Sequence, residues 1–323
     1  MNKQDLRIIF MGTPDFAVAS LRALVEQGYN VVAAITMPDK AKGRHQSEMQ
    51  ASPVKRYAEH QGIPVLQPER LKDEGFVEKL RSYQADLQIV VAFRMLPEVV
   101  WSMPRLGTFN LHGSLLPQYR GAAPINWPII NGDTETGVTT FFLTHEIDTG
   151  HIIQKASIPI ADDDCAGTIH DRLMHLGASL VVDTVEKILS GCVTLIPQEQ
   201  LTEGVVLRSA PKIFKDTCRI DWAVGTKRVY DFIRGLSPYP AAWTMLQQPG
   251  QKEQVVKIYR SEKIFATHSY AVGTLLTDYR SYIHIATIDG YVSLLDLQLA
   301  GKKRMDVRSL LNGFKPVEGT CVV

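Results

Sequence analysis

The chain has 323 residues, of which 45% are hydrophobic and 21% charged, and its formal net charge is +1. These proportions are ordinary for a globular protein and exclude wholesale disorder. No apolar run approaches the roughly 20 residues of a membrane helix, and the first run, residues 8–11, is too short for a signal peptide. We therefore expect a cytoplasmic protein, with two domains as the default at this length.

The charge is unevenly distributed along the chain. Residues 201–323 hold 17 basic and 11 acidic side chains, whereas the other 200 residues hold 18 basic and 23 acidic ones. Because partners respond to local fields, the basic C-terminal part could attract a polyanion such as RNA. An ordinary solvated basic face is the competing explanation.

In chain order, the N-terminal part alternates apolar runs with amphipathic stripes, which predicts an α/β domain with a parallel, Rossmann-like sheet. Strands are predicted at 6–11, 31–35, 64–66, 87–92 and 106–111, and helices at 16–26, 53–61, 73–83 and 161–190. Ser52 and Pro53 suit the cap and first position of a helix. The turn at 12–16 lacks Gly-x-Gly-x-x-Gly, which disfavours dinucleotide binding.

The periodicity fades after residue 190, and the remainder has a different pattern. A helix is predicted at 229–236 and short strands at 255–259, 273–277, 283–287 and 291–297. Several short strands in a small region indicate an OB-like β-barrel, closed or partly closed. We predict a catalytic domain at 1–190, a linker at 191–209 and a C-terminal domain at 210–323.

Three polar residues carry the chemistry. Asn110 and His112 lie at the carboxyl end of a predicted strand, where open α/β sheets bind ligands, and Asp148 follows in an Asp-Thr-Gly turn. An amine that attacks a formamide-type carbonyl must lose a proton while the oxygen gathers negative charge. Asn110 could donate to this oxyanion, His112 could act as an acid, and Asp148 could hold the imidazolium and accept the amine's proton.

Other chemistries fit less well. Ser114 is a candidate nucleophile, but no Gly-x-Ser-x-Gly elbow surrounds it. His112, His145 and His151 lack a recognised ligand spacing, so no catalytic metal is expected. The four cysteines are scattered and contain no Cys-x-x-Cys pair, so no disulfide is assigned.

Beyond this chemistry, the motifs resemble those of the folate-dependent formyltransferases, in the form that acts on methionyl-tRNA. The resemblance rests on the opening strand and turn, on Asn-Leu-His-Gly-Ser-Leu-Leu-Pro at 110–117, on Tyr-Arg-Gly-Ala-Ala-Pro at 119–124 and on the residues near Asp148. It continues through 219–222, 238–243 and 301–305, so it covers nearly the whole chain.

The resemblance implies formyl transfer from 10-formyltetrahydrofolate to the α-amino group of methionyl initiator tRNA for translation initiation, with Asn110, His112 and Asp148 as catalytic residues. It also implies a folate site and an RNA-binding loop at 38–52. The implied folate residues are Ser114, Leu115, Leu116 and Pro117, with Phe93, Met95 and Leu96 around the pterin. The implied tRNA contacts are Lys40, Lys42 and Arg44, in addition to the C-terminal barrel.

The chain departs from the family pattern at two places. Residues 45–48 read His-Gln-Ser-Glu where several lysines are common, and Arg94 stands where a glycine-containing, slightly longer segment is common. The alternatives left open are a formyltransferase acting on a small amine, a formyltetrahydrofolate hydrolase, and a binding protein that has lost its chemistry. We expect a monomer.

Overall fold

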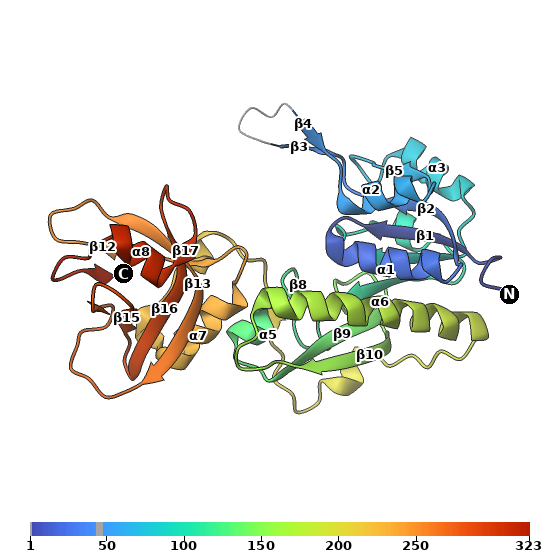
Figure 1. The fold of residues 1–323 in the computed structure, drawn as a ribbon. Coiled ribbons are helices and arrows are strands. Elements are labelled where there is room, and N and C mark those ends of the chain that lie inside the picture. The colour runs from blue at the N-terminus through green and yellow to red at the C-terminus, as the bar shows by residue number, and fades with distance from the viewer. Residues whose placement is uncertain (1, 43–47) are drawn as a thin grey trace. The chain divides into compact units, whose positions relative to one another are not determined.

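A computed structural model describes residues 2–42 and 48–323 (Figure 1). The chain divides into two compact units that are described separately. Unit 1 comprises Met1–Pro124, Thr136–Ile158 and His170–Ser209, and unit 2 comprises Ile125–Glu135, Pro159–Ile169 and Ala210–Val323. The predicted limits at 190 and 210 differ from this division, because two earlier segments pack with the C-terminal part.

Unit 1 is built on a seven-stranded sheet with the order β10-β9-β7-β6-β1-β2-β5. The strands are β1 (Arg7–Gly12), β2 (Asn30–Ile35), β5 (Val65–Leu66), β6 (Leu87–Val91), β7 (Thr108–His112), β9 (Glu135–Phe142) and β10 (Ile152–Pro159). The pairs from β7 to β5 are parallel, as predicted, whereas β9 runs antiparallel to β7. The α/β parallel architecture is confirmed, and the antiparallel side is an addition that the sequence pattern did not predict.

Helices connect these strands, and their ends follow local side-chain chemistry. They are α1 (Asp15–Glu26), α2 (Pro53–His60), α3 (Glu74–Ser82), α4 (Glu98–Trp101) and α6 (Ala166–Ser190). Ser52 accepts a hydrogen bond from the Lys55 amide at 3.0 Å, so it caps α2 as predicted. Two short hairpin strands, β3 (Lys40–Lys42) and β4 (Glu48–Gln50), the short strand β8 (Arg120–Gly121) and the 3-10 helix η1 (Gln198–Leu201) complete the unit.

Unit 2 contains a nearly closed antiparallel barrel, which confirms the predicted OB-like domain. The strand order is β14-β15-β16-β13-β12-β18, and β17 pairs with β16. The strands are β12 (Ala242–Gln247), β13 (Gln254–Phe265), β14 (Leu275–Thr277), β15 (Ile283–Ala286), β16 (Gly290–Leu299), β17 (Met305–Asp306) and β18 (Cys321–Val322). Backbone hydrogen bonds join the segments around the first and last strands of this order and so nearly close the barrel. The Val322 amide donates to the Gly273 carbonyl at 2.9 Å, and the Leu275 amide donates to the Thr320 carbonyl at 3.2 Å.

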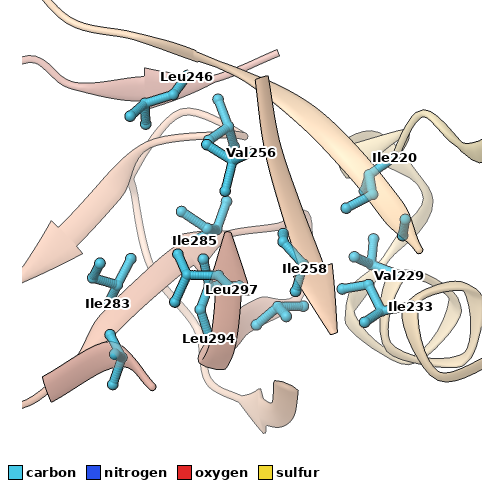
Figure 2. Close-up of a cluster of buried hydrophobic side chains, with 14 of the residues drawn as sticks. Ile220, Val229, Ile233, Leu246, Val256, Ile258, Ile283, Ile285, Leu294 and Leu297 are labelled. Atoms are coloured by element: carbon cyan, nitrogen blue, oxygen red, sulfur yellow. The ribbon is translucent and has the colours of Figure 1, made fainter. Parts of the chain in front are cut away.

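The barrel encloses an apolar core (Figure 2). Val229 and Ile233 project from one helix beside Ile258 of β13, and all three side chains are fully buried. The remaining elements of the unit are α5 (Asn126–Ile130), α7 (Thr226–Gly235), α8 (Val307–Gly313), β11 (Ser209–Ala210, shared with the end of unit 1), η2 (Asp216–Cys218) and η3 (Trp222–Val224).

Candidate active site

Strand β7 presents the first two predicted catalytic residues on one face. Phe109 and Leu111 are buried, and Asn110 and His112 alternate with them, so the two polar side chains project to the opposite side of the sheet. The register pairs Asn110 with Phe141 and His112 with Thr139 of β9. The apolar alternation of a buried strand therefore fixes the direction of both groups.

His112 is held in a defined protonation pattern. Its Nε2 lies 2.9 Å from the Tyr119 carbonyl oxygen, and because a carbonyl can only accept, Nε2 carries a hydrogen. The other nitrogen, Nδ1, lies 3.9 Å from Asp148 Oδ2. This separation is too long for a direct hydrogen bond, but it lets the carboxylate attract the ring when the ring is protonated. In the neutral ring, Nδ1 is therefore the free acceptor.

Burial lowers the pKa of His112 below the ordinary 6.5, because the charged ring loses its water. Two contacts oppose this effect: the Asp148 carboxylate attracts the imidazolium, and the Tyr119 carbonyl accepts its hydrogen bond. The ring is only 6% exposed, so desolvation prevails and the neutral form is favoured near pH 7.

Asp148 comes from the segment between β9 and β10. Its φ of 56° lies in the left-handed region, which aspartate tolerates better than most residues. Its Oδ2 accepts a hydrogen bond from the Gly121 amide at 2.9 Å. Gly150, two residues later, must be glycine, because a Cβ there would lie 1.7 Å from the Phe142 carbonyl oxygen. The predicted Asp-Thr-Gly turn thus brings the carboxylate to His112.

Asn110 is half-buried, and within residues 2–42 and 48–323 no group forms a hydrogen bond with its carboxamide. Its two N–H groups thus remain available to an acceptor that enters the site. The arrangement supplies a neutral hydrogen-bond donor, a titratable ring and a carboxylate, which are the group types needed for acyl transfer between nitrogens.

Most side chains in the segment after His112 are buried and contribute to packing. Ser114 and Leu116 are fully buried, and Leu116 packs with Phe141 and Ile152. The Ser114 hydroxyl donates to the Gln118 carbonyl at 2.7 Å, which weakens the nucleophile interpretation because its hydrogen is given to a carbonyl rather than to a base. Pro117 is buried and Leu115 half-buried. The folate contacts predicted here would therefore use the backbone and Leu115 rather than the side chains of Ser114 and Leu116.

The predicted pterin residues differ in exposure. Leu96 is buried in the core of unit 1, Phe93 is half-buried against the same core, and Met95 is 73% exposed. Arg94 donates to the Glu69 carbonyl at 2.8 Å and also to that of Pro68, and burial lowers its pKa. Arg94, where the chain departs from the family pattern, thus joins this segment to residues 68–69 by hydrogen bonds.

The predicted RNA residues are only partly described. Lys40 and Lys42 lie on β3, where they pair with Gln50 and Glu48 of β4. Arg44 lies outside the described residues. In the described part of the chain, no cluster of three or more His, Cys, Asp or Glu side chains could hold a metal ion. The same part contains no helix with the length and apolar character to span a membrane.

Sequence reasoning missed the backbone partners of the catalytic groups. The Tyr119 carbonyl orients His112, and the Gly121 amide holds Asp148. Both residues belong to the Tyr-Arg-Gly motif, which signalled the family but carried no side-chain chemistry that would assign these roles.

Comparison with known proteins agrees with the fold. Residues 6–185 match the sequence model of the Formyl transferase family, and residues 212–315 match that of the Formyl transferase C-terminal domain. The chain therefore belongs to the formyl transferase family.

Relatives that match this chain over nearly its whole length share one name within the family. The chain is 65% identical over 318 residues to a Methionyl-tRNA formyltransferase of Parabacteroides distasonis, with 98% of each chain covered. It is 53% identical over 316 residues to a Methionyl-tRNA formyltransferase of Porphyromonas gingivalis, with 97% of each covered.

Solved structures share the fold at low sequence identity. A sugar 3N-formyl transferase, WlaRD, aligns with a TM-score of 0.63 at 20% identity over 92% of this chain and 99% of its own. HypX from Aquifex aeolicus, solved with tetrahydrofolic acid, gives 0.62 at 20% identity over 97% of this chain and 48% of its own.

Proposed function

We propose that this protein transfers the formyl group of 10-formyltetrahydrofolate to the α-amino group of methionyl initiator tRNA. The observation that carries the proposal is the full-length identity, up to 65%, to relatives named Methionyl-tRNA formyltransferase. The described chemistry of Asn110, His112 and Asp148 supports the same reaction, because these groups suit transfer between two nitrogens without a covalent enzyme intermediate.

In this reaction the amine nitrogen attacks the formyl carbon and its new C–N bond forms while the carbonyl oxygen becomes negative. Asn110 donates a hydrogen bond to that oxygen, a contact whose removal typically costs roughly 3 to 4 kcal/mol. The C–N bond to the folate nitrogen then breaks, and the formyl group remains on the amine. The proton lost by the amine must reach the departing nitrogen.

His112 and Asp148 carry this proton. The neutral Nδ1 faces a carboxylate at 3.9 Å, so the ring can take up the proton as attack proceeds and return it to the departing nitrogen. Asp148 stabilises the imidazolium in the interval and is the alternative acceptor, directly or through a water. Burial keeps the ring neutral beforehand, which leaves it ready to accept.

The donor is proposed to lie along residues 114–117, with its pterin near Phe93, Met95 and Leu96. A flat heteroaromatic ring suits an apolar slot with a few backbone donors and acceptors. The RNA is proposed to contact Lys40, Lys42 and Arg44 and the basic C-terminal barrel. A monomeric state and a cytoplasmic location remain part of the same proposal.

A labelled donor tests the proposal. The protein is incubated with 10-formyltetrahydrofolate labelled in the formyl group and with charged methionyl initiator tRNA, and label on the methionine is measured. Uncharged tRNA and free methionine are the controls, and neither should be labelled. Label on small amines, or release of labelled formate without transfer, would favour the two alternative activities.

Salt dependence tests the RNA partner separately. Phosphate contacts release counterions, so log affinity for the tRNA should fall linearly and steeply as log salt rises. A flat response would contradict an electrostatic RNA-binding surface and favour a small-molecule acceptor.

A further inference from the structure

A buried glutamine lies in the segment that sequence patterning assigns to a linker. Gln198 begins η1, and its side chain is fully buried. A buried amide is costly unless its donors and acceptor are paired. The hydrogen-bond partners of the Gln198 side chain therefore indicate which part of the structure this segment supports.

The amide nitrogen of Gln198 holds both sides of the Asp-Thr-Gly turn. Nε2 donates to the Asp148 carbonyl at 2.9 Å and to the Gly150 carbonyl at 2.8 Å. Because both partners are carbonyls, the nitrogen rather than the oxygen must face the turn, and both of its hydrogens are used. The backbone of the turn that carries the proposed catalytic carboxylate is thus held by the Gln198 side chain.

The amide oxygen connects this support to the segment that holds the carboxylate. Oε1 accepts two hydrogen bonds from Arg120, from Nε at 3.0 Å and Nη2 at 2.7 Å. The next residue, Gly121, donates its amide to Asp148 Oδ2 at 2.9 Å. Residues 120–121 therefore fix Asp148 twice: directly at its carboxylate, and through Gln198 at its backbone.

The support is itself anchored to the sheet. Ile196 and Ile152 exchange two backbone hydrogen bonds, each of 2.9 Å, at the start of β10. Ile196 and Leu201 also pack on the cluster of Leu116, Phe141 and Ile152. Gln198 is thus held on both sides along the chain by contacts to the strands that flank the site.

We propose that Gln198 and Arg120 are positioning residues that hold Asp148 at its working distance from His112. The need for such a device follows from the backbone, since a non-glycine residue at a φ of 56° is not held there by its own preference. Without these hydrogen bonds, the turn relaxes and the Asp148 carboxylate moves away from the ring.

The test compares two glutamines whose side-chain amides each donate two hydrogen bonds. Gln198→Met keeps the side-chain length but removes every hydrogen bond. Gln154→Met is the control, because Gln154 also donates twice, to the Leu180 carbonyl at 3.0 Å and Thr184 Oγ1 at 2.8 Å, and accepts once, from Lys187 at 2.6 Å. Among the described residues, no hydrogen bond or ion pair joins these control partners to Asn110, His112 or Asp148.

The first measurement is NMR titration of the His112 ring in the substrate-free protein. Asp148 and the Tyr119 carbonyl are the groups that raise its pKa against burial. In Gln198→Met we expect this pKa to fall, in the same direction as in Asp148→Asn, whereas Gln154→Met should leave it unchanged. This measurement uses no substrate, so it stands even if the proposed function is wrong.

The second measurement is turnover, which rests on the proposed function. We expect kcat to fall by up to about 100-fold in Gln198→Met with little change in KM, since misplacement of a catalytic group by about 1 Å can cost that much. An unshifted His112 titration together with wild-type kcat would overturn the proposal. If Gln198→Met does not fold, Arg120→Met is used, which leaves both donors of Gln198 in place, and its predicted changes have the same direction and smaller size.

Discussion

Asn110 and His112 belong to β7, whereas Asp148 belongs to the segment between β9 and β10. The strand pair is directed by its apolar neighbours Phe109 and Leu111, which are buried in the sheet. The carboxylate is instead fixed by polar contacts, including the Gly121 amide. A core-held group resists local change, while a group held by hydrogen bonds depends on each of its partners.

The largest effect is expected for His112→Ala. Loss of the ring removes the proposed proton carrier, so turnover should fall roughly 100- to 10,000-fold, the range of acid-base residues. Formyl transfer and circular dichroism are measured together, and the control is His60→Ala, at an exposed position at the end of α2. Unchanged activity in His112→Ala would overturn its assigned role.

Asn110→Ala should follow, with kcat lower by roughly 100- to 1,000-fold, as for removal of an oxyanion donor. Steady-state kinetics check it. Asn110→Asp keeps the shape but replaces the donor nitrogen by oxygen, so it should lose at least as much. Retained activity in Asn110→Asp would contradict a donor role and would leave only a steric one.

Asp148→Asn keeps the shape and removes the charge, and formyl transfer should fall by at least about 100-fold. This substitution also separates the contribution of the strand from that of the loop. His112 stays in place on β7, but it loses the electrostatic attraction of the Asp148 carboxylate. The His112 pKa, already lowered by burial, should fall further, which NMR titration measures. A raised pKa would mean that Asp148 does not face the ring as an anion.

Stability should depend on pH through the same histidine. Its folded pKa lies below the ordinary 6.5, so as pH falls through that value the unfolded chain binds a proton that the native ring does not. The free energy of unfolding should therefore decrease as pH falls from about 6.5 toward the folded pKa. Urea unfolding at pH 7.5 and 5.5 measures this, and His112→Asn should reduce the difference.

The smallest effect is expected for Arg44→Ala, far along the chain from both catalytic segments. Loss of one phosphate contact should weaken tRNA binding about uniformly and reduce the salt slope by about 1. Kinetics with varied tRNA and varied donor separate the two substrates, and Arg81→Ala on α3 is the control. A loss confined to donor affinity would contradict the assignment to RNA.

The regular part of unit 1 was predictable because its strands are continuous apolar runs and its helices have clear stripes. The antiparallel strand β9 was not, since its buried residues include Thr136, Thr139 and Thr140, which do not give an apolar signal. In unit 2, β13 extends to Phe265, beyond the predicted end at 259, because alternation with exposed residues weakens its far half.

The sequence could point to Asn110, His112 and Asp148 as candidate catalytic residues because of their chemistry and motif spacing. Their supports were not predictable, because the Tyr119 carbonyl and the Gly121 amide are backbone groups that any residue type supplies. Gln198 was hidden for another reason. It lies in 191–209, where no periodicity exists, and its burial results from tertiary contacts alone.

Residues 125–135 and 159–169 belong to unit 2, and this has a practical consequence for making truncated versions of the protein. The Arg234 guanidinium donates to the Asp164 carbonyl at 2.9 Å, the Tyr230 hydroxyl to that of Asp162 at 2.7 Å, and the Asn126 amide to that of Gly235 at 2.8 Å. A fragment ending at residue 190 would strip Asn126, Asp162 and Asp164 of these partners. We therefore expect segments 125–135 and 159–169 of such a fragment to be cleaved by protease faster than in the full chain.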